Sequence, residues 1–237
     1  MLKKLKAKFK SLEFRWAKTS PKRYVSFLRK RGIIIGENIW FTPFLDTVWI
    51  DLTRPSLVTI GDNVRINKNF TLLTHDGGYY ALLQKYNEFV PQSGHVKIGN
   101  NVYFGRNCSV FKGVTIGDNC IIGFGSVVTR DIPANSVAVG APAKVVATID
   151  EYYAKRCKLS VIEAFEYARS IQERWNRRPK VEEFWEEFPL FVDKENVHLY
   201  PTLPYKRQLG ASYDIWMKNH KRQFDNFEEF LSAAGVK

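Results

Sequence analysis

Apolar positions recur every six residues through the middle of the chain. From Val96 to Asp131 the sequence divides into VKIGNN, VYFGRN, CSVFKG, VTIGDN, CIIGFG and SVVTRD. The third position of every block is apolar, and the fourth is Gly in four of the six. Residues 58–75 repeat the pattern as VTIGDN, VRINKN and FTLLTH. A period of six fits neither an amphipathic helix nor an alternating strand. It predicts a short strand and a tight turn in each block, with one large side chain facing inward.

Three such blocks make one triangular coil, and stacked coils bury side chains that no single block can bury alone. Gly and Asn in the turns are expected to supply the positive φ angles of the corners. The pattern therefore predicts a mainly β protein, a parallel β-helix over residues 32–147. Ile98 lies 26 residues after Leu72, which is not a multiple of six. Residues 77–95 are accordingly predicted to leave the coil as a loop, which carries several aromatic side chains.

Both flanks of the repeat have helical patterns. Leu2, Leu5, Phe9, Leu12 and Trp16 have helical spacing within residues 2–16. Ser20 and Pro21 are typical of a helix start, here of a helix that reaches about Arg31. Residues 1–31 are thus expected to form a basic helical arm. Residues 148–237 lack the hexad and are expected to form a helical extension, in which Ser160 and Glu163 suggest a capping box at a helix start.

The positive charge of the chain is concentrated at its N-terminus. The net charge is +12, but residues 1–32 hold twelve Lys and Arg and one acid, which leaves +1 for the remainder. A basic helix with an apolar face suits an anionic membrane surface, so residues 1–17 could contact a membrane. The alternative is a helix that packs on the β-helix with its lysines in water. No nucleic-acid recognition fold accompanies the charge, so no nucleic-acid partner is expected.

Composition favours a cytoplasmic protein. If the basic arm binds a membrane, the protein would be peripheral at the inner face of the cytoplasmic membrane. No apolar run is long enough to span a bilayer, and the basic N-terminus lacks the apolar core of a signal peptide. Cys108, Cys120 and Cys157 form no CxxC pair, and the first two occupy inward repeat positions. This favours reduced thiols.

The most informative polar residues stand where the repeat breaks, in the sequence His75-Asp76-Gly77-Gly78. His75 occupies the last position of the array before it breaks, beside two glycines and the predicted loop, so its imidazole is expected at the surface, facing a cleft. A single His is more often structural than catalytic, but the position of His75 beside the break makes a structural and a catalytic role about equally expected.

The hexads, the THDGG break and the closing TRDIPANSVAVGAPAKVV resemble the left-handed β-helix, hexapeptide-repeat acyltransferases. The similarity covers residues 32–147 and is greatest to galactoside/maltose acetyltransferases and bacterial surface-polysaccharide O-acetyltransferases. It implies a left-handed coil, a homotrimer, a saccharide acceptor, acetyl-CoA as acyl donor in the groove between neighbouring bodies, and no metal.

The resemblance also implies roles for individual residues. His75 matches the catalytic His, a general base that takes a proton from a sugar hydroxyl as it attacks the thioester. Either Asp76, its neighbour in sequence, or Asp51, in a stretch where relatives carry acceptor-site acids, could orient it. The residues matched to acetyl-CoA binding are Tyr103, Gly125, Ser126, Thr129, Arg130 and Lys144. Two departures concern the donor: relatives often have Trp at Tyr103 and a small residue at Phe124.

Three other functions remain open at this point. N-acetylation of an amino sugar or sugar nucleotide would need the same donor, and the sequence does not decide between the two. A non-catalytic β-helix scaffold or binding module would need no base at all. A zinc carbonic anhydrase of the same fold needs three imidazoles at one metal, whereas the repeat region holds only His75 and His95.

Overall fold

The computed structural model describes residues 11–237 of the chain and divides it into two compact units. The first unit ends at Tyr152, and the second runs from Tyr153 to Lys237. Their buried cores share no residue. Within residues 11–237, no helix combines the length and the apolarity needed to cross a bilayer.

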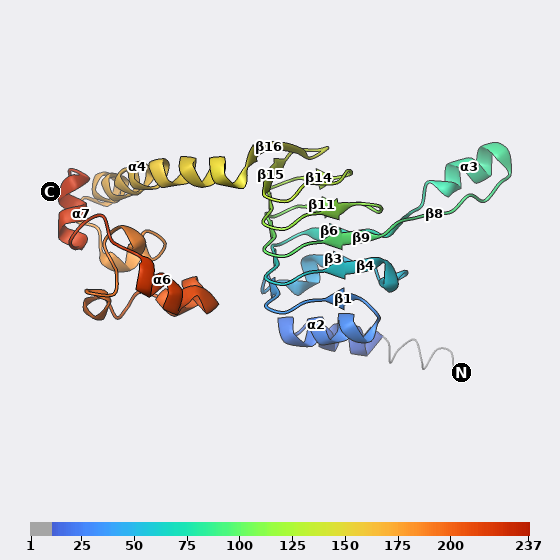
Figure 1. Ribbon diagram of the computed structural model, residues 1–237, viewed down its shortest axis with the longest axis horizontal. Helices are drawn as coiled ribbons and strands as arrows, with labels where there is room; N and C mark the ends of the chain where they lie inside the picture. Colours follow the sequence, from blue (N-terminus) through green and yellow to red (C-terminus); the bar gives the residue numbers. More distant parts are fainter. Residues whose placement is uncertain (1–10) are drawn as a thin grey trace. The chain divides into compact units, whose positions relative to one another are not determined.

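The first unit is a parallel β-helix with three faces, so the predicted coil is confirmed (Figure 1). Face A stacks β1 (Ile34–Ile35), β4 (Val58–Ile60), β9 (Val96–Ile98) and β12 (Thr115–Ile116). Face B stacks β2 (Trp40–Phe41), β5 (Arg65–Ile66), β10 (Tyr103–Phe104), β13 (Ile121–Ile122), β15 (Ser136–Val139) and β16 (Lys144–Thr148). Face C stacks β3 (Val48–Ile50), β6 (Phe70–Leu72), β11 (Ser109–Val110) and β14 (Val127–Val128). Within these three faces, all pairs are parallel except β15–β16. Two short 3₁₀ helices, η1 (Leu45–Thr47) and η2 (Pro55–Leu57), precede β3 and β4.

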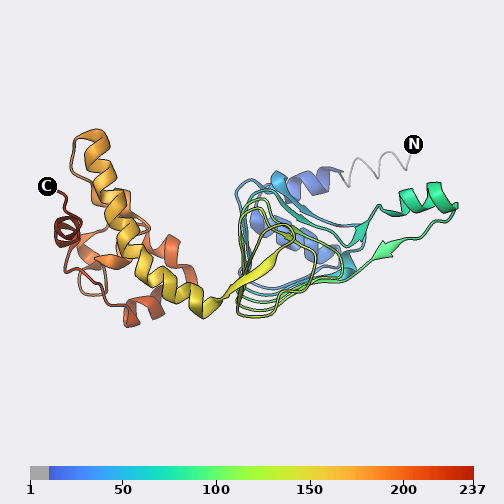
Figure 2. The same cartoon turned by 90° about the horizontal axis from the view of Figure 1, so that it is seen from above.

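Seen along its axis, the coil outlines a triangle whose interior is filled by the repeat's apolar positions (Figure 2). The third residues of successive blocks lie in register, as Ile60, Ile98 and Ile116 do on face A. Phe70 and Phe104 meet edge to face inside the triangle, with ring centroids 4.9 Å apart. The thiols of Cys108 and Cys120 are buried, as predicted, and burial raises the pKa of both.

The corner between faces A and B is built from asparagines with positive φ. Asn38, Asn63, Asn101, Asn119 and Asn135 have φ between 55° and 59°. The side-chain amides of the first four each donate to the Asn oxygen of the next coil, with N–O distances of 2.7 to 3.0 Å. The expectation that turn asparagines adopt positive φ is therefore confirmed.

Gly113 and Gly125 have the predicted positive φ, but the glycines at the fourth position of the repeat serve a different purpose. Gly99, Gly105 and Gly117 are absent from the residues with positive φ. A Cβ on Gly105 would lie 2.7 Å from the Phe124 nitrogen, and one on Gly117 would lie 2.4 Å from the Ala134 nitrogen. Glycine is required here because the next coil's backbone passes too closely for any side chain.

Two helical segments close the base of the β-helix. Residues 11–17 are helical, and α2 (Pro21–Lys30) begins at Ser20, whose hydroxyl accepts from the Arg23 N–H, as predicted. Residues 1–10, which carry most of the predicted apolar face and of the lysines of the arm, lie outside the described residues. β3 is the edge strand of face C, and Lys18 Nζ donates to its Val48 carbonyl at 2.8 Å. An otherwise open strand edge thereby gains a partner and a charge.

The chain leaves the coil after Thr74, as the broken count predicted. β7 (His75–Asp76) pairs antiparallel with β8 (Gln92–Ser93), and α3 (Tyr79–Tyr86) lies between them. The Tyr79 and Phe89 rings pack together with centroids 4.3 Å apart, and Phe89, Tyr80 and Tyr86 are all exposed. The short helix and the strand pair were not anticipated from the sequence.

The rest of the chain is helical, beginning with α4 (Ile149–Trp175), most of which belongs to the second unit. The predicted start at Ser160 is wrong, since Ser160 lies in the middle of α4 and Glu163 pairs with Arg156. The helix instead starts with a reciprocal cap, in which Thr148 N–H donates to Glu151 and Glu151 N–H donates to Thr148 Oγ1. The remaining elements are η3 (Val181–Phe184), η4 (Phe188–Leu190), η5 (Val197–Leu199), α5 (Tyr205–Leu209), η6 (Gly210–Ser212), α6 (Tyr213–Asn219) and α7 (Phe227–Ala233).

Candidate active site

A buried carboxylate stands at the end of β3. Asp51 follows directly after the strand, and its N–H donates to the Leu72 carbonyl of β6, so the backbone is fixed by the sheet. The residue is only 2% exposed. Oδ1 accepts from the N–H and the hydroxyl of Thr53, at 2.8 and 2.7 Å. Oδ2 accepts from the N–H and the hydroxyl of Thr74, at 3.1 and 2.5 Å. The arrangement holds one rotamer of the carboxylate firmly.

His75 completes this group from the next coil. Its Nδ1 lies 2.6 Å from Asp51 Oδ2 and 3.1 Å from the Thr53 hydroxyl. The carboxylate can only accept, so Nδ1 carries a proton and the neutral ring keeps its lone pair on Nε2. The His75 side chain is 34% exposed, against 3% for Asp51. A buried anion therefore orients an imidazole whose ring reaches solvent.

The pKa of the Asp51 carboxyl lies well below its usual range. Burial alone would raise this pKa, but hydrogen bonds from Thr74, from the backbone and hydroxyl of Thr53 and from His75 outweigh it. The carboxylate is therefore ionised near neutral pH. The sequence analysis missed both threonines. Thr53 follows Asp51 by two residues, a spacing typical of an Asp that turns back onto the chain, and this signal could have identified it.

Asp76, the other predicted partner of the histidine, has different contacts. Its Oδ1 accepts from the Gly78 N–H at 2.5 Å, and its Oδ2 lies 3.9 Å from Lys112 Nζ. Asp76 thus closes the turn that leads into the loop. Within residues 11–237, no group of three or more His, Cys, Asp or Glu side chains is placed to hold a metal ion.

The root of the loop is held tightly beside the histidine. When the chain returns, Gly94 N–H donates to the Thr74 carbonyl at 3.0 Å. A Cβ on Gly94 would lie 2.6 Å from the Gly113 nitrogen, so the two backbones touch. The excursion that begins at His75 therefore returns to a fixed point one coil below Gly113.

Two of the residues matched to acetyl-CoA binding share a corner with His75. On face C, Leu72, Val110 and Val128 are in register, so the segments that follow them stack at the corner between faces C and A. Thr129 and Arg130 follow Val128, and both are exposed. They lie two coils from Thr74, roughly 10 Å along the axis by strand spacing. Lys112 lies in the coil between them.

The other predicted donor residues lie elsewhere on the coil. Gly125 and Ser126 form the turn before β14, at the opposite end of face C. There the Gly125 N–H donates to the Arg106 carbonyl, and the buried Ser126 hydroxyl donates to the Gly123 carbonyl, so both groups stabilise the coil itself. Phe124 stands beside them, 71% exposed. Lys144 begins β16, and Tyr103 points outward from face B. One chain therefore does not bring all six residues together.

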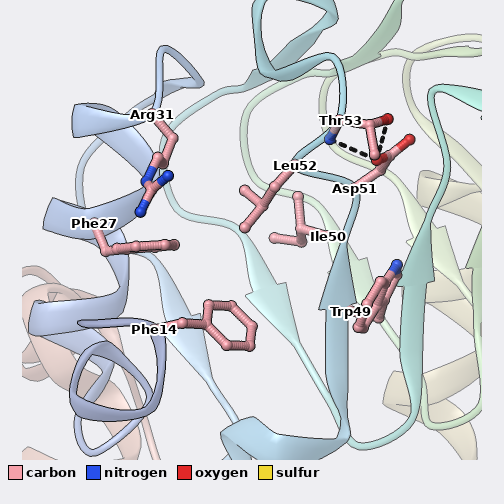
Figure 3. Close-up of a pocket in the computed structure, with 8 residues that line it drawn as sticks. All are labelled: Phe14, Phe27, Arg31, Trp49, Ile50, Asp51, Leu52 and Thr53. Carbon is pink, nitrogen blue, oxygen red and sulfur yellow. Dashed lines mark hydrogen bonds between the residues drawn. The ribbon is translucent and has the colours of Figure 1, made fainter. Parts of the chain in front are cut away.

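A mostly apolar pocket adjoins the Asp51 group at the base of the coil. It has a volume of about 340 Å³ and is lined by Phe14, Phe27, Arg31, Trp49, Ile50, Asp51, Leu52 and Thr53. Figure 3 shows Phe14, Phe27 and Arg31 projecting from the N-terminal helices toward Ile50 and Leu52. Asp51 and Thr53 belong both to this wall and to the hydrogen-bonded group around His75.

The sequence is similar to acetyltransferases along most of the first unit. Residues 95–130 match the family described as bacterial transferase hexapeptide (six repeats). The chain is 34% identical over 177 residues to the galactoside O-acetyltransferase of Escherichia coli (strain K12), covering 66% of this chain and 86% of that one. It is 35% identical over 144 residues to protein CapG of Staphylococcus aureus, covering 61% of this chain and 79% of that one. The predicted fold class, a left-handed parallel β-helix of hexapeptide repeats, is confirmed.

Solved structures of similar proteins include two sugar acetyltransferases. A maltose O-acetyltransferase from Clostridium difficile 630 aligns with a TM-score of 0.41 at 28% identity, over 60% of this chain and 84% of that one. A galactoside acetyltransferase in complex with coenzyme A aligns with a TM-score of 0.44 at 30% identity, over 59% of this chain and 78% of that one.

Proposed function

The chain belongs to the hexapeptide-repeat acetyltransferases, and we propose that it transfers the acetyl group of acetyl-CoA to a hydroxyl of a glycan or smaller saccharide, with His75 as general base. The relatives support acetyl transfer to a sugar. The observation that carries the base assignment is the Asp51–His75 pair, with 2.6 Å between Oδ2 and Nδ1.

The proposed chemistry follows from that geometry. A sugar hydroxyl is a poor nucleophile at neutral pH, and acetyl-CoA supplies an activated thioester carbonyl. His75 Nε2 takes the hydroxyl proton as the oxygen attacks, while the Asp51 carboxylate stabilises the imidazolium that forms. The imidazolium then returns the proton to the departing sulfur, which leaves CoA as a thiol and the sugar as an acetyl ester. A backbone N–H from a turn of the adjacent body is proposed to stabilise the developing oxyanion.

A homotrimer would reconcile the scattered donor residues. Thr129 and Arg130 lie at the corner of His75, whereas Tyr103 projects from a different face. An extended ligand in a groove between two neighbouring bodies could contact one face of each. In such a groove the exposed side chains of Arg130 and Lys144, and the half-buried side chain of Lys112, would attract the phosphates of the donor. The exposed aromatics of the loop, Tyr80 and Tyr86, would then meet either the saccharide or the neighbouring subunit.

The test is a transfer screen with acetyl-CoA across neutral sugars, amino sugars and oligosaccharides. His75→Ala is expected to lower kcat by about 10²- to 10⁴-fold, with the KM for acetyl-CoA little changed. Asp51→Asn should also be strongly impaired, because an amide next to Nδ1 no longer fixes the tautomer. Asp76→Asn is the matched control and should lose far less.

Two results would change the assignment. Wild-type activity in His75→Ala would indicate another base, whereas no transfer by the wild-type protein to any acceptor would indicate a binding module without catalysis. Transfer to amino sugars alone would identify an N-acetyltransferase.

A peripheral membrane contact is proposed for the N-terminal arm. Leu12 and Trp16, 61% and 60% exposed, form the described part of the predicted apolar face, and the guanidinium of Arg23 lies 4.7 Å from the Trp16 ring. We expect the full chain to sediment with vesicles containing phosphatidylserine and a chain without residues 1–17 to remain in solution. Equal binding by both would rule the contact out.

A further inference from the structure

The pocket below Asp51 has walls of two origins. Phe14, Phe27 and Arg31 come from the helices that close the base, and Ile50 and Leu52 from the end of β3. β3 is the edge strand of face C, so no further strand lies below it, and helical side chains line the pocket there instead. Phe14 and Phe27 pack against each other with ring centroids 5.7 Å apart, which makes the helical wall a single apolar surface.

The pocket's one charged helical residue is already neutralised. Arg31 forms an ion pair with Glu13 at 2.7 Å, and its guanidinium lies 4.7 Å from the centre of the Phe27 ring. A phosphate or carboxylate would therefore have to compete with Glu13 and then meet the Asp51 carboxylate beyond. The charge arrangement favours an uncharged apolar occupant.

The pocket also adjoins the proposed reaction centre. Asp51 and Thr53 line it, and the Thr53 hydroxyl is 3.1 Å from His75 Nδ1. Its volume of about 340 Å³ is at the lower end of the range usual for small-molecule sites, about 300–1,000 Å³. This is enough for a short hydrocarbon chain or an aromatic ring, while the rest of the ligand remains near the imidazole.

We propose that this pocket is an acceptor subsite that binds an uncharged alkyl or aryl group attached to the saccharide. This inference rests on the proposed function, because it takes the ligand near His75 to be the acetyl acceptor. The apolar group is held between Phe14 and Leu52, and the sugar to which it is attached extends past Thr53 toward His75. Contacts in the pocket increase the affinity for the acceptor, and the apolar group itself does not react.

The experiment measures the affinity of the full chain for methyl, butyl and octyl β-galactopyranosides by isothermal titration calorimetry, with octyl below its micellar concentration. Burial of one methylene is worth roughly three- to fourfold in affinity, so butyl should bind at least about tenfold more tightly than methyl. The gain should level off when the chain exceeds the pocket.

Two variants of the pocket and one control separate this effect from general stickiness. Leu52→Phe fills the pocket, and Phe14→Ser makes its helical wall polar. Either should reduce the butyl advantage to less than about threefold. Leu12→Ala removes an exposed apolar residue from the same helical segment without touching the pocket, and it should keep the full advantage.

The proposal is overturned by affinities that do not depend on chain length, or by an equal loss in Leu12→Ala and Phe14→Ser. A chain-length effect that appears only after removal of residues 1–10 would show that the chain's own N-terminus occupies the pocket. Because binding is measured without turnover, a normal chain-length effect in a protein that transfers no acetyl group would contradict the proposed function and leave the subsite standing.

Discussion

Asp51 couples the candidate site to the stability of the fold. The unfolded chain has an Asp pKa near 3.9, and the folded pKa is lower because Thr53, Thr74 and His75 donate to the carboxylate. Above about pH 5 both states are ionised and the stabilisation is complete. As the pH falls below that value, the unfolded chain takes up a proton first, so the free energy of unfolding decreases toward the folded pKa.

The prediction is tested by comparing the free energy of unfolding in urea of the wild type with that of Asp51→Asn as a function of pH. Wild type should be the more stable by a constant amount between pH 5 and 7. The difference should shrink steadily as the pH is lowered from about 4.5 to 3. A difference that is constant over the whole range would mean that Asp51 titrates alike in the folded and unfolded chains.

At the scale of single residues, the sequence located one member of the site and left its partner open. His75 was recognisable because the count of six fails immediately after it. Asp51 and Asp76 were both candidates, and nothing in the spacing shows which carboxylate faces the ring. That depends on the register of β3 against β6, where Ile50 pairs with Leu72 and the residues after each strand meet. The same register brings Thr74 to the Asp51 carboxylate, to which Thr53 also donates.

At the scale of the repeat element, the asparagine ladder makes a testable contribution to stability. Asn101 has a φ of 56°, accepts from Asn63 and donates to Asn119. Asn101→Ala loses both hydrogen bonds and forces an alanine into the left-handed region, at about 1–2 kcal/mol for the backbone alone. Asn101→Gly loses the bonds but not the backbone conformation.

We therefore expect the free energy of unfolding to follow the order wild type, Asn101→Gly, Asn101→Ala, as measured in urea. The alanine variant should be roughly 2–3 kcal/mol less stable than wild type. Equal loss in the two variants would place the whole contribution in the hydrogen bonds and none in the backbone.

The hexads predicted the strands well because each block places an apolar residue at a fixed position that faces the inside of the coil. They did not distinguish the two kinds of turn residue. Gly105 and Asn101 both stand at corners, but Gly105 is needed because a side chain would not fit there, and Asn101 because its φ is positive. The cap at Thr148 and Glu151 was missed for another reason. Ser160 and Glu163 have the same spacing, and only the continuous helix from Ile149 excludes them.

At the scale of the whole molecule, the chain carries two separate cores. The loss of the hexad after about residue 147 indicated a change of structure, but composition could not show whether the helical residues have a core of their own. Phe184, Phe191 and Phe230 are fully buried in the second unit, where the rings of Phe184 and Phe191 both pack against that of Phe230. Phe70 and Phe104 have the same role inside the β-helix.

Two cores without shared residues should unfold in two steps. We expect differential scanning calorimetry of the full chain to show two transitions. Phe104→Ala, in the β-helix, should lower the temperature of one of them, and Phe184→Ala, in the helical unit, that of the other. Each substitution should cost about 3–5 kcal/mol in its own unit, because it opens a cavity among fully buried rings. A single transition that both variants lower alike would mean that the two units unfold as one, in which case the helical extension contributes directly to the stability of the coil that holds Asp51 and His75.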